Sequence, residues 1–159
     1  MNIFHISEIM DLGIEKEKKR RDFYGLVAEQ FREQQLKELF SRLRDWEQTH
    51  IKKFTEIKDT LPPDEAAQTY PGELSAYMQA LVDDKLYKIS LVQEFRKNVK
   101  TPLDAVRYGI EFEKDAILFF VEIKDYTLDP HKEIIQKLLA EERQHIIYLL
   151  ELQKKLNSQ

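Results

Sequence analysis

Two five-residue stretches, Trp46-Glu47-Gln48-Thr49-His50 and Glu141-Glu142-Arg143-Gln144-His145, indicate how this chain folds. Each places a Glu three residues before a His, in the middle of an apolar stripe with helical spacing. Such a stripe is the core-facing side of an amphipathic helix, so each Glu and His should point inward. A carboxylate in a helix core costs on the order of several kcal/mol unless an opposite charge accompanies it. Two Glu/His pairs at matching places in the two stripes therefore predict a cation that both pairs share.

Both stripes step along the chain by four and three residues. The first stripe consists of Leu36, Phe40, Leu43, Glu47, His50, Phe54 and Ile57. The second consists of Ile135, Leu138, Glu142, His145, Leu149, Leu152 and Leu156. Because residues three apart on a helix lie side by side, the Glu and His of one stripe can both reach a metal centre.

The composition limits the classes of protein to which the chain can belong. Its 159 residues suit a single domain, expected over 1–159, with a net charge of −4. No Lys/Arg stripe stands apart from matching acids, which argues against a nucleic-acid partner. No apolar run approaches the ~18 residues of a membrane span, and no signal-peptide pattern opens the chain, so we expect a cytoplasmic protein. The absence of Cys excludes disulfides, iron–sulfur clusters and thiolate zinc.

Few Gly and Pro residues, four and five respectively, indicate a mostly helical chain. Long helices are expected at about 7–33, 35–60, 102–126 and 130–156. Ser7 is suited to cap the first helix, and Gln34-Gln35 to turn the chain into the second. Thr101-Pro102-Leu103-Asp104 predicts a clean restart, with Thr as N-cap, Pro at the first helical position and an acid at the third. Asp129-Pro130 repeats this device before the last helix.

The segment between the second and third long helices is the least regular part of the chain. Leu61-Pro62-Pro63 should end the second helix, because Pro lacks the amide donor and clashes with the preceding turn. About forty residues then pass before the third helix, with short helix expected within 73–95. Such a length is typical of a crossover that lets the second and third helices run parallel. The predicted fold class is therefore all-α, a four-helix bundle with a long crossover between helices two and three.

An internal repeat identifies two further acids. Gly13-Ile14-Glu15-Lys16-Glu17-Lys18 matches Gly109-Ile110-Glu111-Phe112-Glu113-Lys114 at an offset of 96 residues, and the two Glu/His pairs repeat at an offset of 95. On the third helix, Glu113 fills a gap in the apolar seam, whereas Glu111 falls off that face. The seam consists of Val106, Ile110, Ile117 and Phe120. By the repeat, Glu17 is the inward acid of the first helix and Glu15 the solvated one.

The complete set of candidate metal ligands is Glu17, Glu47, His50, Glu113, Glu142 and His145. Their four carboxylates bring a charge of −4, which two divalent cations balance. Oxygen and imidazole donors favour iron or manganese over magnesium or calcium, and zinc also suits them. We expect two ions ~3.5–4 Å apart, with Glu47 and Glu142 as bridges. Each His should bind through one nitrogen and donate the other to an outer acceptor.

These motifs resemble the ferritin-like di-iron carboxylate superfamily, and most closely its rubrerythrin-related branch. The resemblance rests on the two Glu/His pairs and on an inward Glu followed by an aromatic pair, Glu17 with Phe23-Tyr24 and Glu113 with Phe119-Phe120. It implies a ferritin-like bundle that holds two iron ions. It also implies reaction with oxygen or hydrogen peroxide, using electrons from an external donor protein or from ferrous iron.

The chain also departs from proteins of this superfamily at several points. Rubrerythrins proper carry an extra Glu one turn after the third-helix ligand, where this chain has Ala116, and a Cys-rich module that is absent here. Both differences argue against the peroxidase cycle of those proteins. Bacterioferritins share the six-ligand set but place a haem Met where this chain has Gln48. Cage ferritins add a fifth helix, whereas here the sequence stops after the fourth.

Three functions remain open on the sequence alone. The leading one is a di-iron oxidoreductase, the second an iron-binding or ferroxidase-type protein without a distinct substrate, and the third a metal-free scaffold. A polar core without metal leaves few ways to satisfy four buried acids and two imidazoles. Tyr24 is interpreted as a core residue that could also reach the site, Trp46 as a packing residue, and Arg20 as a surface or outer charge.

We also expect a homodimer rather than a cage. Two-fold dimers are the commonest oligomers, and the crossover carries more large apolar side chains than one layer needs. These side chains are Tyr70, Tyr77, Met78, Tyr87 and Phe95.

Overall fold

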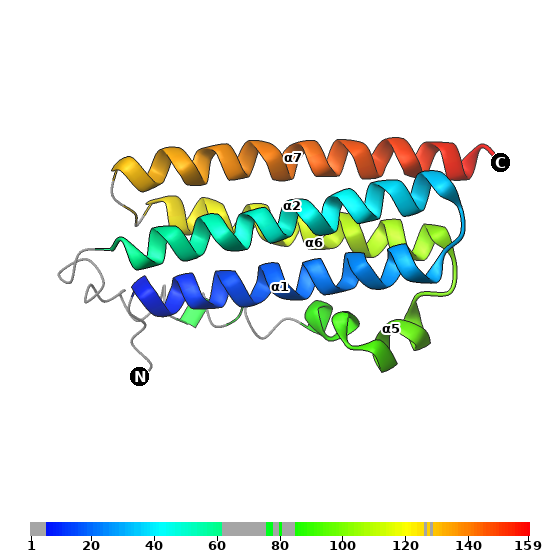
Figure 1. The fold of residues 1–159 in the computed structure, drawn as a ribbon, viewed down its shortest axis with the longest axis horizontal. Helices are drawn as coiled ribbons and strands as arrows, with labels where there is room; N and C mark the ends of the chain where they lie inside the picture. Colours follow the sequence, from blue (N-terminus) through cyan, green and yellow to red (C-terminus); the bar gives the residue numbers. More distant parts are fainter. Residues whose placement is uncertain (1–5, 62–75, 78–79, 81–84, 126, 128) are drawn as a thin grey trace.

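The computed structural model describes residues 6–61, 76–77, 80, 85–125, 127 and 129–159. Four long helices lie side by side along one axis (Figure 1). They are α1 (Ile6–Gln30), α2 (Gln34–Asp59), α6 (Pro102–Asp125) and α7 (Asp129–Asn157). Two shorter helices precede α6, the 3-10 helix η1 (Lys85–Ser90) and α5 (Val92–Asn98). The described residues contain no strand, so the all-α four-helix prediction is confirmed.

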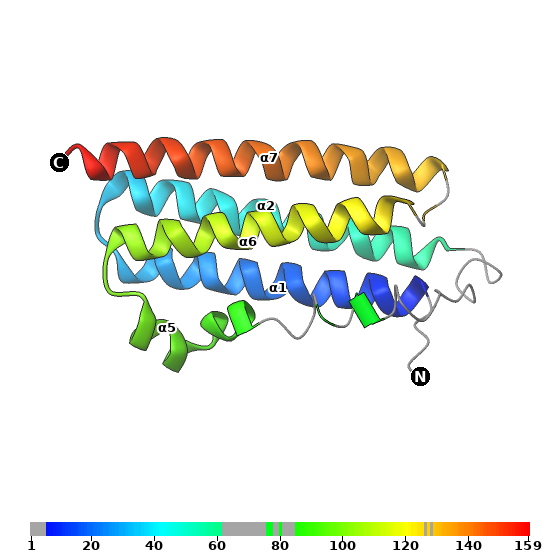
Figure 2. The same cartoon turned by 180° about the vertical axis from the view of Figure 1, so that it is seen from behind.

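The order of the helices in space is that of two hairpins joined by a crossover. α1 packs against α2 and α6 against α7, and the two hairpins meet through α1 with α6 and α2 with α7. α2 and α6 run in the same direction (Figures 1 and 2), which confirms the predicted crossover. Within the described ranges, no helix combines the length and apolarity that a membrane crossing requires.

The crossover contributes packing surface to its own bundle. η1 and α5 lie along α1 (Figure 2), and Tyr87 and Phe95 are buried there. Two of the five side chains used to predict a dimer are therefore covered within the chain. Tyr77 is exposed, and Tyr70 and Met78 lie outside the described residues. The dimer itself stays a prediction.

The turn between α1 and α2 lies at residues 31–33, not at Gln34-Gln35 as predicted. Gln34 already belongs to the first turn of α2, where its side-chain amide donates to Glu38 at 2.7 Å. α1 ends earlier than expected because Phe31 and Leu36 are both buried on either side of the turn. The short connection lets both apolar side chains enter one core.

The start of α6 follows the predicted capping pattern. The backbone amide of Asp104 donates to Oγ1 of Thr101 at 3.2 Å, and Oδ2 of Asp104 accepts from the amide of Thr101 at 2.9 Å. This reciprocal pair satisfies donors that a helix N-terminus leaves without intrahelical partners. The amide of Lys100 adds a third hydrogen bond to the same carboxylate. These backbone donors lower the pKa of Asp104.

The core consists of two apolar clusters with a polar layer between them. On α1, Ile14 belongs to one cluster and Phe23 to the other, and Glu17 lies between the two in sequence. On α7, Leu139 and Leu149 flank the polar residues in the same way. Each long helix therefore places polar residues at the middle of the bundle, with apolar packing on both sides.

The two repeat-related glycines are points of close approach between helices. A Cβ on Gly13 would lie 2.8 Å from Cε1 of Phe119, and one on Gly109 would lie 3.2 Å from Cδ2 of Leu149. The glycines therefore let α1 and α6, and α6 and α7, come together beside the polar layer. Their matched placement in the sequence has a packing reason.

We predict that Gly13→Ala destabilises the protein although Ala favours helix. The new methyl group collides with the buried Phe119 ring, and overpacking typically costs about 1–3 kcal/mol. Gly25→Ala is the matched control, because its Cβ meets only Cδ of Arg44 at 3.5 Å and should gain up to ~1 kcal/mol of helix propensity. Urea unfolding of the two variants measures the difference. Equal stability of both variants would contradict the packing argument.

Candidate metal centre

The polar layer gathers all six predicted ligands from the four long helices. Their fractional exposure is 0% for five of them and 3% for His145. Glu17 and Glu113 point inward while Glu15 and Glu111 are exposed, so the prediction from the apolar seam is confirmed. That these residues bind metal remains a prediction.

The six side chains form two overlapping groups. One consists of Glu17, Glu47, His50 and Glu142, and the other of Glu47, Glu113, Glu142 and His145. Within each group, one ligand atom per residue lies within 4.8 Å of the others. Glu47 and Glu142 belong to both groups. This is the arrangement that two bridging and two terminal carboxylates require.

The ring of His50 is fixed by contacts at both nitrogens. Its Nδ1 lies 2.8 Å from Oε1 of Glu142 and 3.6 Å from Oε2 of Glu47, so it faces the carboxylates. Its Nε2 lies 2.7 Å from Oε2 of Glu141, a residue near the surface. Glu141 is therefore the outer acceptor expected for this His, and it leaves Nδ1 for the centre.

His145 faces the centre through the same nitrogen. Its Nδ1 lies 3.1 Å from Oε2 of Glu142 and 3.4 Å from Oε1 of Glu113. The ring is nearly parallel to that of His50, with an interplanar angle of 12° and centroids 5.8 Å apart. On its other face it stacks on Trp46 at 4.8 Å. Trp46 therefore packs directly against a predicted ligand.

The chemistry of the layer fits a pair of cations. Within the described part of the chain, eight buried side-chain atoms lack a hydrogen-bond partner, and six belong to the predicted ligands. They are one oxygen each of Glu17, Glu113 and Glu142, both oxygens of Glu47, and Nδ1 of His50. Buried polar atoms are normally hydrogen-bonded. Nδ1 of His50 and Oε1 of Glu142 lie 2.8 Å apart and can share a proton, but the other carboxylate oxygens have no donor, and divalent metal ions would satisfy them.

Arg20, interpreted from the sequence as a surface or outer charge, lies buried at the centre. It is 1% exposed, and Nη2 donates to Oε1 of Glu17. Its Nε lies 3.6 Å from Oε2 of Glu47, one of the expected bridges. The available signal was its position three residues after Glu17 on the same helix face. Arg20 lies in a run of charged residues, 15–22, and such a run does not indicate which of its side chains is buried.

Tyr24 is a buried core residue whose hydroxyl also reaches the centre, in agreement with its interpretation from the sequence. Its hydroxyl donates to Oε1 of Glu113 at 2.6 Å. Burial and the Glu113 carboxylate raise the pKa of Tyr24 well above its ordinary value, so the hydroxyl stays a donor. Glu17 and Glu113, equivalent in the repeat, therefore have different partners, a guanidinium and a phenol.

A buried network connects this centre to the crossover. Arg20 donates through Nη1 to the hydroxyl of Tyr87 on η1 at 3.1 Å. The Tyr87 hydroxyl donates in turn to Oδ2 of Asp115, which also pairs with Nζ of Lys16 at 2.9 Å. Tyr87 thus attaches the described part of the crossover to the polar layer.

The buried charges shift one another's pKa values in both directions. Burial, and then the neighbouring Glu142, raises the pKa of Glu113 to about 8. Burial alone would lower the pKa of His145, but hydrogen bonds to Glu113 and Glu142 raise it to about 10. Burial would raise the pKa of Glu17, but Arg20, together with hydrogen bonds to Glu47 and His50, lowers that pKa. Without metal, protons and Arg20 therefore compensate the acids.

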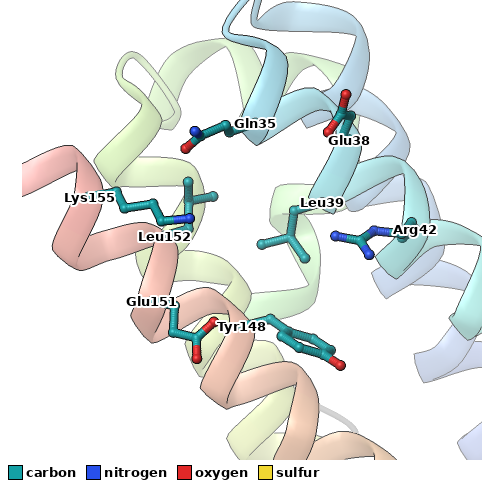
Figure 3. Close-up of a pocket in the computed structure, with 8 residues that line it drawn as sticks. All are labelled: Gln35, Glu38, Leu39, Arg42, Tyr148, Glu151, Leu152 and Lys155. Atoms are coloured by element: carbon teal, nitrogen blue, oxygen red, sulfur yellow. The ribbon is translucent and has the colours of Figure 1, made fainter.

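A cavity of about 310 Å³ between α2 and α7 reaches this centre from outside. It is lined by Trp46, Thr49, Lys53, Glu141, Gln144, His145 and Tyr148. A second cavity of about 210 Å³ (Figure 3) shares Tyr148 with the first. The residues that line it come from α2 and α7 and include none of the six predicted ligands. Only the first cavity touches the polar layer.

We predict that Glu113→Gln lowers the affinity for Zn²⁺ by more than about 100-fold, because loss of even an outer partner costs about 10–100-fold. The metal-free variant should stay folded, because the amide oxygen can still accept from Tyr24. Glu111→Gln, two residues away and exposed, is the control and should bind as the unaltered protein does. Calorimetric titration measures both. Equal losses in the two variants would overturn the assignment of Glu113.

We also predict that the metal-free protein loses stability as the pH rises from about 5 to about 10. The raised pKa values of Glu113 and His145 mean that the native state binds more protons than the unfolded chain in this range. The contribution of His145 is complete below its unfolded value of 6.5 and is lost as the pH passes about 10. The pKa of Glu17 is lowered, so its contribution is lost only at acid pH.

Zn²⁺ should reverse this trend, because its ligands must be deprotonated to bind. The stabilisation by Zn²⁺ should therefore grow with pH, and binding at pH 7 should release at least two protons, one each from Glu113 and His145. Urea unfolding at pH 6 and 9, with and without Zn²⁺, and a pH-indicator titration measure these effects. Metal-free stability that rises between pH 6 and 9 would contradict the electrostatic account.

Comparisons with known proteins agree with this architecture. The structure is similar to the crystal structure of a protein from Thermotoga maritima described as a ferritin-like diiron-carboxylate protein, with a TM-score of 0.71. The two chains are 22% identical, and the match covers 97% of each, so the likeness concerns the fold. The search of curated proteins found no match. The model of the Rubrerythrin family matches residues 8–153, and the chain therefore belongs to that family.

Proposed function

We propose that this protein is a di-iron oxidoreductase that reduces oxygen or hydrogen peroxide with electrons from an external donor protein or from ferrous iron. The observation that carries the proposal is the pair of four-residue groups that share Glu47 and Glu142. Two terminal acids, two shared acids and two imidazoles suit a pair of iron ions, with manganese or zinc as substitutes. The matching family supports the same centre.

Iron held by these six residues would supply a redox-active Lewis acid for the reduction of the oxidant. In balance, one hydrogen peroxide takes up two electrons and two protons, its O–O bond breaks, and two waters form. Bound ferrous iron would supply those two electrons. The chain contains no Cys that could hold an iron–sulfur donor, so a separate protein or further ferrous iron must replace them.

The protein's own residues prepare the place where the oxidant reacts. The two apolar clusters on either side of the layer limit access of water along the bundle. Arg20 holds a positive charge against Glu17 and Glu47, in addition to what two divalent cations bring. With two divalent cations and Arg20 contributing +5 and four carboxylates contributing −4, the centre would carry a net charge of +1. This charge would stabilise negative charge on oxygen as it is reduced.

A second function is favoured by the cavity between α2 and α7. It gives the centre a path from solvent that passes Glu141 and His145. An iron-handling protein that oxidises and releases ferrous iron would use such a path. In that case iron is the substrate, and no donor protein is needed.

The test begins with metal analysis of protein purified without added metal. The protein is then loaded with ferrous iron without oxygen and mixed with peroxide or oxygen in a stopped-flow spectrometer. We expect about two irons per chain and oxidation of two ferrous ions per peroxide. Peroxide consumption that continues while the two irons stay bound identifies the oxidoreductase, whereas oxidation followed by release of the iron identifies iron handling.

Glu47→Gln provides the matched variant, because it removes the charge of a shared acid without changing its shape. It should lose iron and reactivity, while Glu15→Gln, exposed on α1, should keep both. A protein that binds no metal at all would support the scaffold alternative and refute the proposal.

A further inference from the structure

The two halves of the centre differ at one pair of repeat-related positions. Glu141 directly precedes Glu142, and Trp46 directly precedes Glu47, at the same offset of 95 residues that relates His50 to His145. A carboxylate therefore stands in one half where an indole stands in the other. Both side chains contact an imidazole across the interface between α2 and α7.

In the first half, the carboxylate acts on His50. Oε2 of Glu141 lies 2.7 Å from Nε2 of His50, and its other oxygen lies 3.4 Å from Nζ of Lys53. An imidazole that donates to a carboxylate is a more basic metal ligand with a fixed orientation. Partners of this kind typically change metal affinity 10–100-fold.

In the second half, the indole cannot take that role. Its ring stacks on His145 with centroids 4.8 Å apart and an interplanar angle of 11°. An indole offers one N–H donor and no acceptor. Within the described residues, the structure gives Nδ1 of His145 its carboxylate contacts but gives Nε2 no hydrogen-bond acceptor. His145 is positioned by stacking instead.

The surroundings of Trp46 keep its ring in this place. Tyr148 stacks on it at 5.7 Å, and the guanidinium of Arg42 lies 5.8 Å from the centroid of the indole. Arg42 and Tyr148 project from α2 and α7 beside the neighbouring cavity (Figure 3). Trp46, Tyr148 and His145 also line the larger cavity, so the unsupported imidazole borders a path to solvent.

We propose that Trp46 is a positioning residue that makes the two metal positions unequal, so that the position of Glu113 and His145 is the weaker and exchangeable one. The proposal rests on the metal centre of the proposed function. The position of Glu17 and His50 holds its ion more tightly, because Glu141 supports its imidazole. The other position takes up and releases its ion through the cavity between α2 and α7.

Arg20 opposes tighter binding at the position of Glu17 and His50, because its positive charge lies beside Glu17 and repels a cation there. The same charge also acts on Glu47, which both positions share. Arg20 therefore weakens cation binding at both positions, whereas the carboxylate acceptor distinguishes only His50.

The test uses the full chain and redox-inert Zn²⁺, so it does not depend on catalytic activity. Trp46 is the only Trp, and its stacking on His145 makes its fluorescence a reporter of that position. Calorimetry should show two binding steps, with the fluorescence change in the weaker one. A chelator added to the loaded protein should remove that ion first.

Variants then assign each step. Trp46→Glu places a carboxylate acceptor opposite His145 and should tighten the weaker step about 10–100-fold. Glu141→Gln should weaken the tighter step by a similar factor. Trp46→Phe keeps a ring on His145 without an acceptor, and Gln48→Glu adds a charge at an exposed site two residues away. Both controls should leave the weaker step within about twofold, well below the 10–100-fold effect of an acceptor.

Two results would overturn the inference. One is a fluorescence change that accompanies the tighter step, and the other is a Trp46→Glu variant, folded by circular dichroism, whose weaker step is unchanged. If Trp46→Glu does not fold, Trp46→Gln supplies an amide oxygen as a smaller, neutral acceptor and must also tighten that step. Failure of the unaltered protein to bind Zn²⁺ would instead refute the proposed function.

Discussion

Four carboxylates lie in the interior of this helical bundle, and the rest of the structure has to compensate for their charge. Desolvation makes each negative charge costly, and proximity makes each one repel the others. Two imidazoles, one guanidinium and bound protons compensate these charges. The pKa of Glu113 rises, so that this acid holds a proton, whereas the pKa of Glu17 falls because Arg20 lies beside it. This arrangement of buried carboxylate and imidazole groups is compatible with a metal site, where bound ions would replace the protons.

The two apolar clusters provide the stability that the polar layer does not. Each lies between the layer and one end of the bundle, with aromatic and branched side chains from all four long helices. Close contacts at Gly13 and Gly109 bring the helices together on either side of the acids. Burial of the clusters therefore fixes the positions of the charged side chains, although those side chains contribute little favourable energy by themselves.

The internal repeat makes the departures from symmetry informative. Glu17 is paired with Arg20, while its equivalent Glu113 accepts from Tyr24. His50 donates to Glu141, while His145 stacks on Trp46. One half of the centre is thus surrounded by charges and the other by aromatic rings. A symmetric scaffold can in this way present two chemically different positions to a pair of ions.

The sequence alone determined the helical class, the crossover and the inward direction of all six polar residues, through its few Gly and Pro residues, the length of one connection, its helical periodicity and its internal repeat. It could do so because a helix repeats every 3.6 residues, so that burial is visible as spacing. It misplaced the turn at Gln34-Gln35, because polar residues there fit a turn and a first helical turn equally well. The positions of Arg20, Trp46 and Tyr87 were decided only by tertiary structure. A long or amphipathic side chain can reach solvent or core from the same backbone position, and only the facing helices and the crossover settle which of the two it does.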